Sequence, residues 1–158
     1  MAVPNNSSDR VFPAIAARNL QRLDVTLPDA FDGERNVVII AFARSHQELV
    51  DSWVPWLEAR AVADPGLRFF EIPTIARIWA PARPFIDGGM AAAIREPVIL
   101  QRTFTVYGDV NRLTAPLGIT DRSTIALVLV DRAGVVRWSG SGGFQAEVAA
   151  HLAAVLDA

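Results

Sequence analysis

The apolar residues of this chain gather in short runs that alternate with amphipathic stretches, and this pattern predicts an α/β domain. The run from Val37 to Ala43 is uniformly apolar and rich in β-branched residues, as expected of a central strand covered on both faces. Leu67 to Ile72 and Ile125 to Val130 are further apolar runs of strand length. The alternation from Leu20 to Leu27 is imperfect and ends at Pro28, which favours a short edge strand or hairpin arm.

An amphipathic helix is predicted directly after the first central strand. Ser45 and Glu48 have the spacing of a capping box, so the helix should begin at about His46. Pro55 falls inside this helix, where its ring crowds the preceding turn, and it predicts a kink. The turn residues 64–66 end the helix before the next strand, so this part of the chain is predicted to form a βαβ unit.

The rest of the chain is predicted to add a helix, a strand, a short helix, a β-hairpin and a closing helix. In chain order the ranges are Phe85 to Arg95, Val98 to Tyr107, Val110 to Leu117, Ile125 to Trp138 with its turn at Asp131 to Gly134, and Phe144 to Val155. Prolines and small polar residues interrupt residues 1–17. We therefore predict a flexible lead-in over residues 1–17 and one domain over residues 18–158, an α/β fold with a central mixed sheet and helices on both faces.

Composition removes several classes of chemistry. The 158 residues contain no cysteine, which excludes disulfides, thiolate catalysis and Cys-ligated zinc. All 15 basic residues are arginines, so a Schiff-base lysine and a P-loop lysine are excluded as well. Two histidines are too few for a histidine-rich metal site, and no cofactor is predicted.

Charge and hydropathy also limit the partners. A net charge of -2 provides no basic field that would recruit nucleic acid. No apolar run approaches the roughly 18 residues that a membrane span requires. The amino terminus lacks the basic flank and long apolar stretch of a secretory signal, so the expected location is cytoplasmic.

Two stretches in the second half of the chain, Thr105-Val-Tyr-Gly-Asp109 and Arg122-Ser-Thr-Ile125, resemble sequences of the thioredoxin-like superfamily that includes the peroxiredoxins. The stretch from Thr105 to Asp109, followed by a short helix and by Arg122-Ser-Thr-Ile125, looks like the second half of a redoxin domain. The closing pattern resembles the carboxyl-terminal signature of the mitochondrial ATP-synthase assembly-factor family, through Leu129-Val-Asp131, Val136-Arg-Trp138, Gly140-Ser-Gly142, Glu147 and Leu152, with Gln47 and Ser52-Trp53 also similar. The resemblance covers about residues 19 to 158 and implies a three-layer thioredoxin-like fold and, by analogy, an assembly role.

In a thioredoxin-like domain the reactive group lies at the amino terminus of the first crossover helix, where Arg44, Ser45, His46 and Gln47 stand in this chain. Alignment by the proline inside that helix places the redox cysteine positions at about Gln47 and Val50, and neither is a thiol. Free backbone N-H groups, Arg44 and His46 all favour an anion, and a histidine with a pKa of about 6.5 suits acid-base work. Alternatively, the capping residues already satisfy these donors, and Arg44 and His46 are simply solvated.

Two further candidates lie elsewhere in the chain. Arg122 precedes the buried strand at a place that faces the first helix in this fold, where peroxiredoxin-like domains commonly keep an arginine. Asp121 and Ser123 beside it equally suit a turn. Trp79 lies in a proline-broken segment and, if exposed, would indicate a contact surface for a protein or ligand.

Three functions remain open. The leading hypothesis is a redox-inactive thioredoxin-like domain that works by binding an unknown protein partner, in an assembly or chaperone-like role. The second is an enzyme that uses non-thiol chemistry at Arg44, His46 and Arg122 on an anionic small molecule. The third is a small-ligand carrier that uses the apolar middle segment as a lid or a groove. A homodimer is compatible with all three, and none of them requires a metal.

Overall fold

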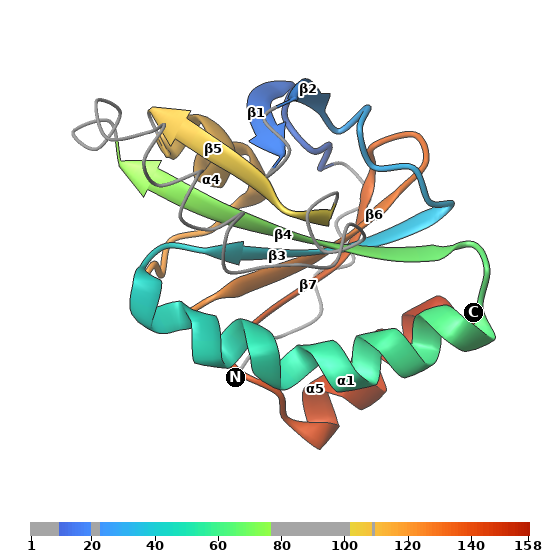
Figure 1. Cartoon of the computed structure of the whole chain (residues 1–158). Helices are drawn as coiled ribbons and strands as arrows, with labels where there is room; N and C mark the ends of the chain where they lie inside the picture. Colours follow the sequence, from blue (N-terminus) through green and yellow to red (C-terminus); the bar gives the residue numbers. More distant parts are fainter. Residues whose placement is uncertain (1–9, 20–22, 77–101, 109) are drawn as a thin grey trace.

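A seven-stranded mixed sheet forms the centre of the protein, in the order β2-β1-β5-β4-β3-β6-β7 (Figure 1). The structure is a computed structural model that describes residues 10–19, 23–76, 102–108 and 110–158. The strands are β1 (Ile15–Asn19), β2 (Asp24–Leu27), β3 (Arg35–Ala41), β4 (Leu67–Ala76), β5 (Phe104–Gly108), β6 (Ala126–Asp131) and β7 (Val136–Ser141). The described helices are the 3-10 turn η1 (Arg44–His46), α1 (Gln47–Ala63), α4 (Asn111–Leu117) and α5 (Ala146–Leu156). Strands β3, β4 and β5 run parallel to one another, and every other pairing is antiparallel.

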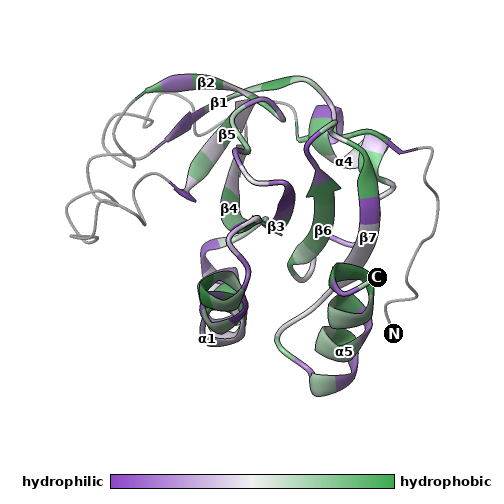
Figure 2. Ribbon diagram, turned by 90° about the vertical axis from the view of Figure 1, so that its right-hand side faces the viewer, coloured by the Kyte–Doolittle hydropathy of each residue, from purple (hydrophilic) through white to green (hydrophobic). Residues whose placement is uncertain are grey.

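Helices cover both faces of the sheet, as the sequence predicts. Figure 2 shows α1 and α5 below the sheet and α4 above it. Side chains of β3 alternate between the two layers, with Val37 and Ile39 in the cluster under α1 and α5, and with Val38 and Ile40 in the cluster under α4. All four are at most 1% exposed. Both faces of β3 are therefore buried, which is why this strand reads as an unbroken apolar run.

The predicted βαβ unit is present at the first crossover. Strand β3, helix α1 and strand β4 form a βαβ unit whose strands pair in parallel from Arg35 opposite Leu67 to Ala41 opposite Pro73. Helix α1 is continuous through Pro55 and ends at the predicted turn. The edge strand β2 forms the predicted hairpin with β1.

The amino-terminal part of the chain joins the fold earlier than predicted. Strand β1 begins at Ile15, and Phe12 is 1% exposed with its ring edge-on to Phe31 at 5.1 Å between centroids. Val11 makes an isolated bridge to Val135 beside the hairpin of β6 and β7. Proline interrupts a ladder of hydrogen bonds but does not prevent burial of the apolar residues around it. Part of the predicted lead-in is therefore core.

The later elements agree with the prediction, apart from the start of β5. Within the described residues, β5 begins at Phe104, and the preceding Thr103 forms an isolated bridge to Glu71. The predicted helix from Phe85 to Arg95 lies outside the described residues. At the predicted hairpin turn, Asp131 accepts hydrogen bonds from the N-H groups of Ala133 and Val135, both at 2.9 Å.

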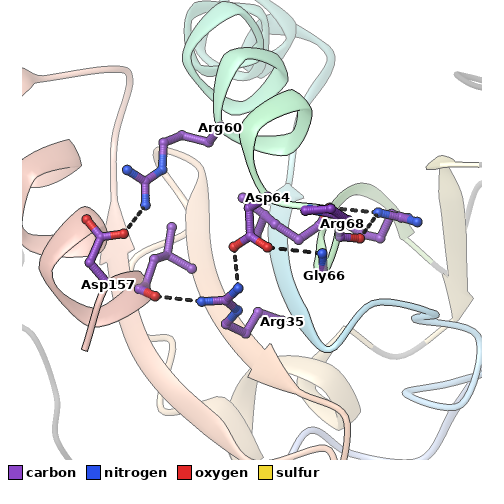
Figure 3. A network of polar contacts seen from close by, with 9 residues as sticks. Arg35, Arg60, Asp64, Gly66, Arg68 and Asp157 are labelled. Carbon is purple, nitrogen blue, oxygen red and sulfur yellow. Dashed lines mark hydrogen bonds and ion pairs between the residues drawn. The ribbon is translucent and has the colours of Figure 1, made fainter.

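Polar contacts fasten the two long helices to the amino end of β3. Figure 3 shows the Arg35 guanidinium reaching both the Leu156 carbonyl, at 2.6 Å, and the carboxylate of Asp64. Beside it, Arg60 of α1 pairs with Asp157 at 2.7 Å. These contacts tie β3, α1 and α5 together at one end of the sheet. The predicted functional site lies at the opposite end.

Candidate functional site

The predicted site is the turn that joins the carboxyl end of β3 to α1. Arg44, Ser45 and Gln47 are exposed there, whereas His46 is only 5% exposed. The Phe42 backbone N-H donates a hydrogen bond to His46 Nδ1 at 3.0 Å, and the Phe42 ring packs edge-on to the imidazole. Because Nδ1 accepts this bond, the proton of the neutral ring lies on Nε2. His46 therefore holds the backbone of the turn in place.

The predicted capping box at this turn is wrong. Helix α1 begins at Gln47, its N-cap is His46, and no side chain makes a capping hydrogen bond. The His46 N-H donates to the Ala43 carbonyl at 3.0 Å, so the chain makes a 3-10 turn before α1. Ser45 consequently lies inside a helical turn, whereas a capping residue needs an extended backbone at the helix boundary. The first turn is left without a side-chain cap.

Arg122 is directed to a different part of the structure. It is exposed, and its guanidinium donates hydrogen bonds to Thr114 Oγ1 at 2.8 Å and to the side chain of Asn111. Both partners belong to α4, which covers the face opposite α1. Across the described ranges, no hydrogen bond or ion pair joins Arg122 to Arg44 or His46.

The residues beside Arg122 behave as a turn. The Ser123 hydroxyl and the Ser123 N-H, the latter at 2.8 Å, both donate to Asp121 Oδ1, and these bonds lower the pKa of the Asp121 carboxyl. Aspartate that binds the backbone two residues later is typical of such turns. The turn interpretation of this segment is thus confirmed.

A polar cluster that the sequence analysis missed lies beneath the first turn of α1. Glu71 occupies the middle of β4, on the same sheet face as Leu67 and Phe69, which pack toward α1. Gln47 donates a hydrogen bond from Nε2 to Asp51 Oδ1 at 2.9 Å. Both of these side chains influence the pKa of Glu71. We call Gln47, Asp51 and Glu71 the carboxylate cluster. The available sequence signal was a single carboxylate inside an otherwise apolar strand.

Glu71 has an unusual protonation equilibrium. Burial raises the pKa of its carboxyl from 4.5 to about 7, and the negative charge of Asp51 adds to this effect. The polar side chain of Gln47 favours the ionised form and opposes the rise of the Glu71 pKa. A group with this pKa exchanges its proton with solvent near neutral pH, which is a common property of functional sites.

The remaining candidate features add little to the description of the site. Trp79 lies outside the described residues. Where the structure describes the chain, no three His, Asp or Glu side chains gather closely enough to hold a metal ion. Among the same residues, no helix combines the length and the apolar character that crossing a bilayer demands.

Comparisons with known proteins give fold relationships. No family model and no curated protein sequence matches the chain. The thioredoxin domain of a thiol-disulfide oxidoreductase from Bacteroides vulgatus is similar, with a TM-score of 0.58 and 20% identity over 88% of this chain and 91% of that one. BsSco, a member of the Sco family of cytochrome c oxidase assembly proteins, is also similar. Its TM-score is 0.62, with 13% identity over 99% of this chain and 96% of BsSco. The pneumococcal exposed lipoprotein thioredoxin Etrx1 from Streptococcus pneumoniae strain TIGR4 has a TM-score of 0.61. Its identity is 10% over 92% of this chain and 99% of Etrx1. Agreement over nearly the whole of each chain shows that this protein has the thioredoxin-like fold predicted from its sequence.

Proposed function

We propose that this domain binds a protein partner through the exposed turn at the carboxyl end of β3, without thiol chemistry. One observation carries the proposal. At the place where thioredoxin-like proteins keep their reactive thiols, this chain exposes Arg44, Ser45 and Gln47, and it contains no cysteine. The adjacent His46 is buried and supports the turn instead of facing a substrate.

The chemistry of this turn favours a partner that supplies hydrogen-bond acceptors. Arg44 offers a guanidinium that can bind a carboxylate through two hydrogen bonds. The first turn of α1 has no side-chain cap, and the positive end of the helix dipole favours negative charge. An acidic segment of a partner protein would supply carboxylates for Arg44 and negative charge for the amino end of α1.

An assembly role is supported by analogy. BsSco is a member of the Sco family of cytochrome c oxidase assembly proteins, and it has a similar fold over almost its whole length. The carboxyl-terminal motifs of this chain resemble those of an ATP-synthase assembly-factor family. The analogy suggests an assembly role but does not identify the partner. The partner is to be sought with probes placed at the exposed turn.

The two rival functions receive less support. Catalysis at Arg44, His46 and Arg122 would need these groups near one substrate, yet Arg122 is bonded to α4 and His46 Nδ1 is occupied by a backbone N-H. The ligand-carrier hypothesis depends on the apolar middle segment, which lies largely outside the described residues.

Site-specific photo-crosslinking tests the proposal. A photoreactive amino acid replaces Ser45 at the turn or, as a control, Val62 near the other end of α1, where the side chain is 86% exposed. In lysate of the source organism, we expect a discrete crosslinked species from position 45 and none from position 62. Arg44→Glu should abolish the product. Equal crosslinking at both positions, no product at position 45, or a product that survives Arg44→Glu would each contradict the proposal.

A further inference from the structure

We propose that a pocket between the loop that follows β2 and the hairpin turn of β6 and β7 binds a small zwitterion, of the class of free apolar α-amino acids. The pocket has a volume of about 260 Å³ and is lined by Pro28, Asp29, Phe31, Asp32, Arg132 and Ala133. It lies at the amino end of β3, where Arg35 pairs with Asp131 in the sheet. The exposed turn before α1 follows the other end of β3, so this site is separate from the proposed protein-binding surface.

The two walls of the pocket touch each other, and each is fixed by its own hydrogen bonds. A Cβ placed on Gly134 would lie only 3.2 Å from Cγ of Pro28, so the hairpin turn packs directly against the loop. In the loop, the Phe31 N-H donates to the Pro28 carbonyl at 2.9 Å. In the turn, the Gly134 N-H donates to the Asp131 carbonyl at 3.0 Å. Figure 1 shows the loop in blue, leading from β2 to β3, and the hairpin in orange.

A buried asparagine fastens the loop to the sheet. The side-chain amide of Asn36 donates to the carbonyls of Gly33 at 3.1 Å and Val130 at 3.2 Å, and its Oδ1 accepts the Gly33 N-H at 2.9 Å. Since Gly33 ends the loop and Val130 lies on β6, these bonds hold the first wall against the strand that carries the second. The pocket is therefore already formed before a ligand arrives, which lowers the entropic cost of binding.

Charges of opposite sign line the two walls. Asp29 and Asp32 lie on the loop, Arg132 lies on the turn, and all three are exposed. Within the part of the chain that the structure describes, their side chains make no ion pair and no hydrogen bond. Asp131, by contrast, already binds Arg137 and the backbone of the turn. A ligand that carries an ammonium group and a carboxylate would supply a partner to both walls, and the guanidinium can bind that carboxylate through two hydrogen bonds.

The other lining residues favour a ligand with a small apolar body. Pro28, Phe31 and Ala133 contribute apolar surface to the pocket. The Phe31 ring is fixed from behind, because its centroid lies 5.1 Å from that of Phe12 and 5.0 Å from that of Phe70. Pockets for drug-sized ligands have volumes of about 300 to 1,000 Å³. A pocket of about 260 Å³ suits a smaller molecule, such as an amino acid with a short hydrocarbon side chain.

NMR titration of the full chain with L-leucine and two analogues tests the site. Isopentylamine lacks the carboxylate of leucine, 4-methylpentanoate lacks its ammonium group, and both keep the hydrocarbon body. We expect leucine to shift the backbone amide signals of Phe31 and Ala133 to saturation. Each analogue should bind about fivefold more weakly, the effect of losing one exposed ion pair. No shift of these signals, or equal affinity for leucine and either analogue, would overturn the proposal.

Charge-neutral variants assign the two ends of the ligand. Arg132→Gln should bind leucine about fivefold more weakly and no better than isopentylamine, because the carboxylate then lacks its partner. Asp29→Asn combined with Asp32→Asn should instead remove the preference for leucine over 4-methylpentanoate. Arg112→Gln, which changes an exposed arginine on α4, is the control and should leave the affinities unchanged. The same leucine affinity in Arg132→Gln as in Arg112→Gln would contradict the assignment of the pocket as the binding site.

Discussion

Replacement of Glu71 by glutamine should change how the stability of this protein depends on pH. In the folded chain the pKa of Glu71 is raised to about 7, from an ordinary value of 4.5. Between these two pH values the folded state holds more protons than the unfolded state. The free energy of unfolding must therefore fall as the pH rises through this window. Below pH 4.5 the contribution is fully present, and above about pH 7 it is lost.

The two pKa values set the size of the effect. The difference between 4.5 and about 7, at about 1.36 kcal/mol per pH unit, corresponds to about 3 kcal/mol. This is an upper limit, because Glu71 is only partly buried and water screens part of the penalty. Glutamine has nearly the same shape as a protonated glutamate and does not ionise. Glu71→Gln should thus match the unmodified chain near pH 4.5 and exceed its stability at pH 8 by as much as about 3 kcal/mol.

Urea unfolding measures this difference. The fluorescence of the buried Trp53 and Trp138 reports unfolding at pH 5, 6, 7 and 8 for the unmodified chain and for the variant. Glu58→Gln, at an exposed position of α1, serves as the matched control and should run parallel to the unmodified chain. A constant gap between Glu71→Gln and the unmodified chain from pH 5 to pH 8 would refute the reasoning. A gap that narrows as the pH rises would do the same.

Three further substitutions test the scaffold by chemical denaturation. Asn36→Ala removes a fully buried side chain that makes three hydrogen bonds to the backbone, so we expect a loss of about 3 kcal/mol; a loss below about 1 would show that these bonds contribute little. Gly118 has a φ of +69°, and an added Cβ would lie 2.0 Å from Arg10 Nη1, which binds the end of α4. Gly118→Ala should therefore cost about 1 kcal/mol more than Gly142→Ala, whose φ is +87° but whose Cβ would meet open space; equal losses would contradict this explanation. Arg35→Ala should destabilise the protein by about 2 kcal/mol, since it frees α5 and α1 from the start of β3, and an unchanged urea midpoint would count against that role.

Where the apolar pattern is strong, the sequence determined the fold. Burial of both faces of β3 requires an unbroken apolar run, and the turn at Asp131 to Gly134 requires a side chain that can bind its own backbone, so both were readable locally. The order of strands and helices followed from these signals. The burial of Phe12 in the core could not be predicted from the sequence, because Pro13 and the polar residues before Phe12 resemble a linker. Its burial also depends on contact with Phe31, which is distant in the chain.

The candidate site was determined only in part by the sequence. The absence of cysteine and the identity of the residues in the turn after β3 were visible in the chain itself. The direction in which each side chain points was not visible in the sequence, because it depends on partners that are distant in the chain or on local backbone geometry. Arg122 binds α4, and the 3-10 turn removes Ser45 from the capping position. Only the tertiary structure brings Glu71 of β4 beneath α1, where the loss of water and a neighbouring carboxylate change its protonation, since desolvation is a property of packing and not of sequence.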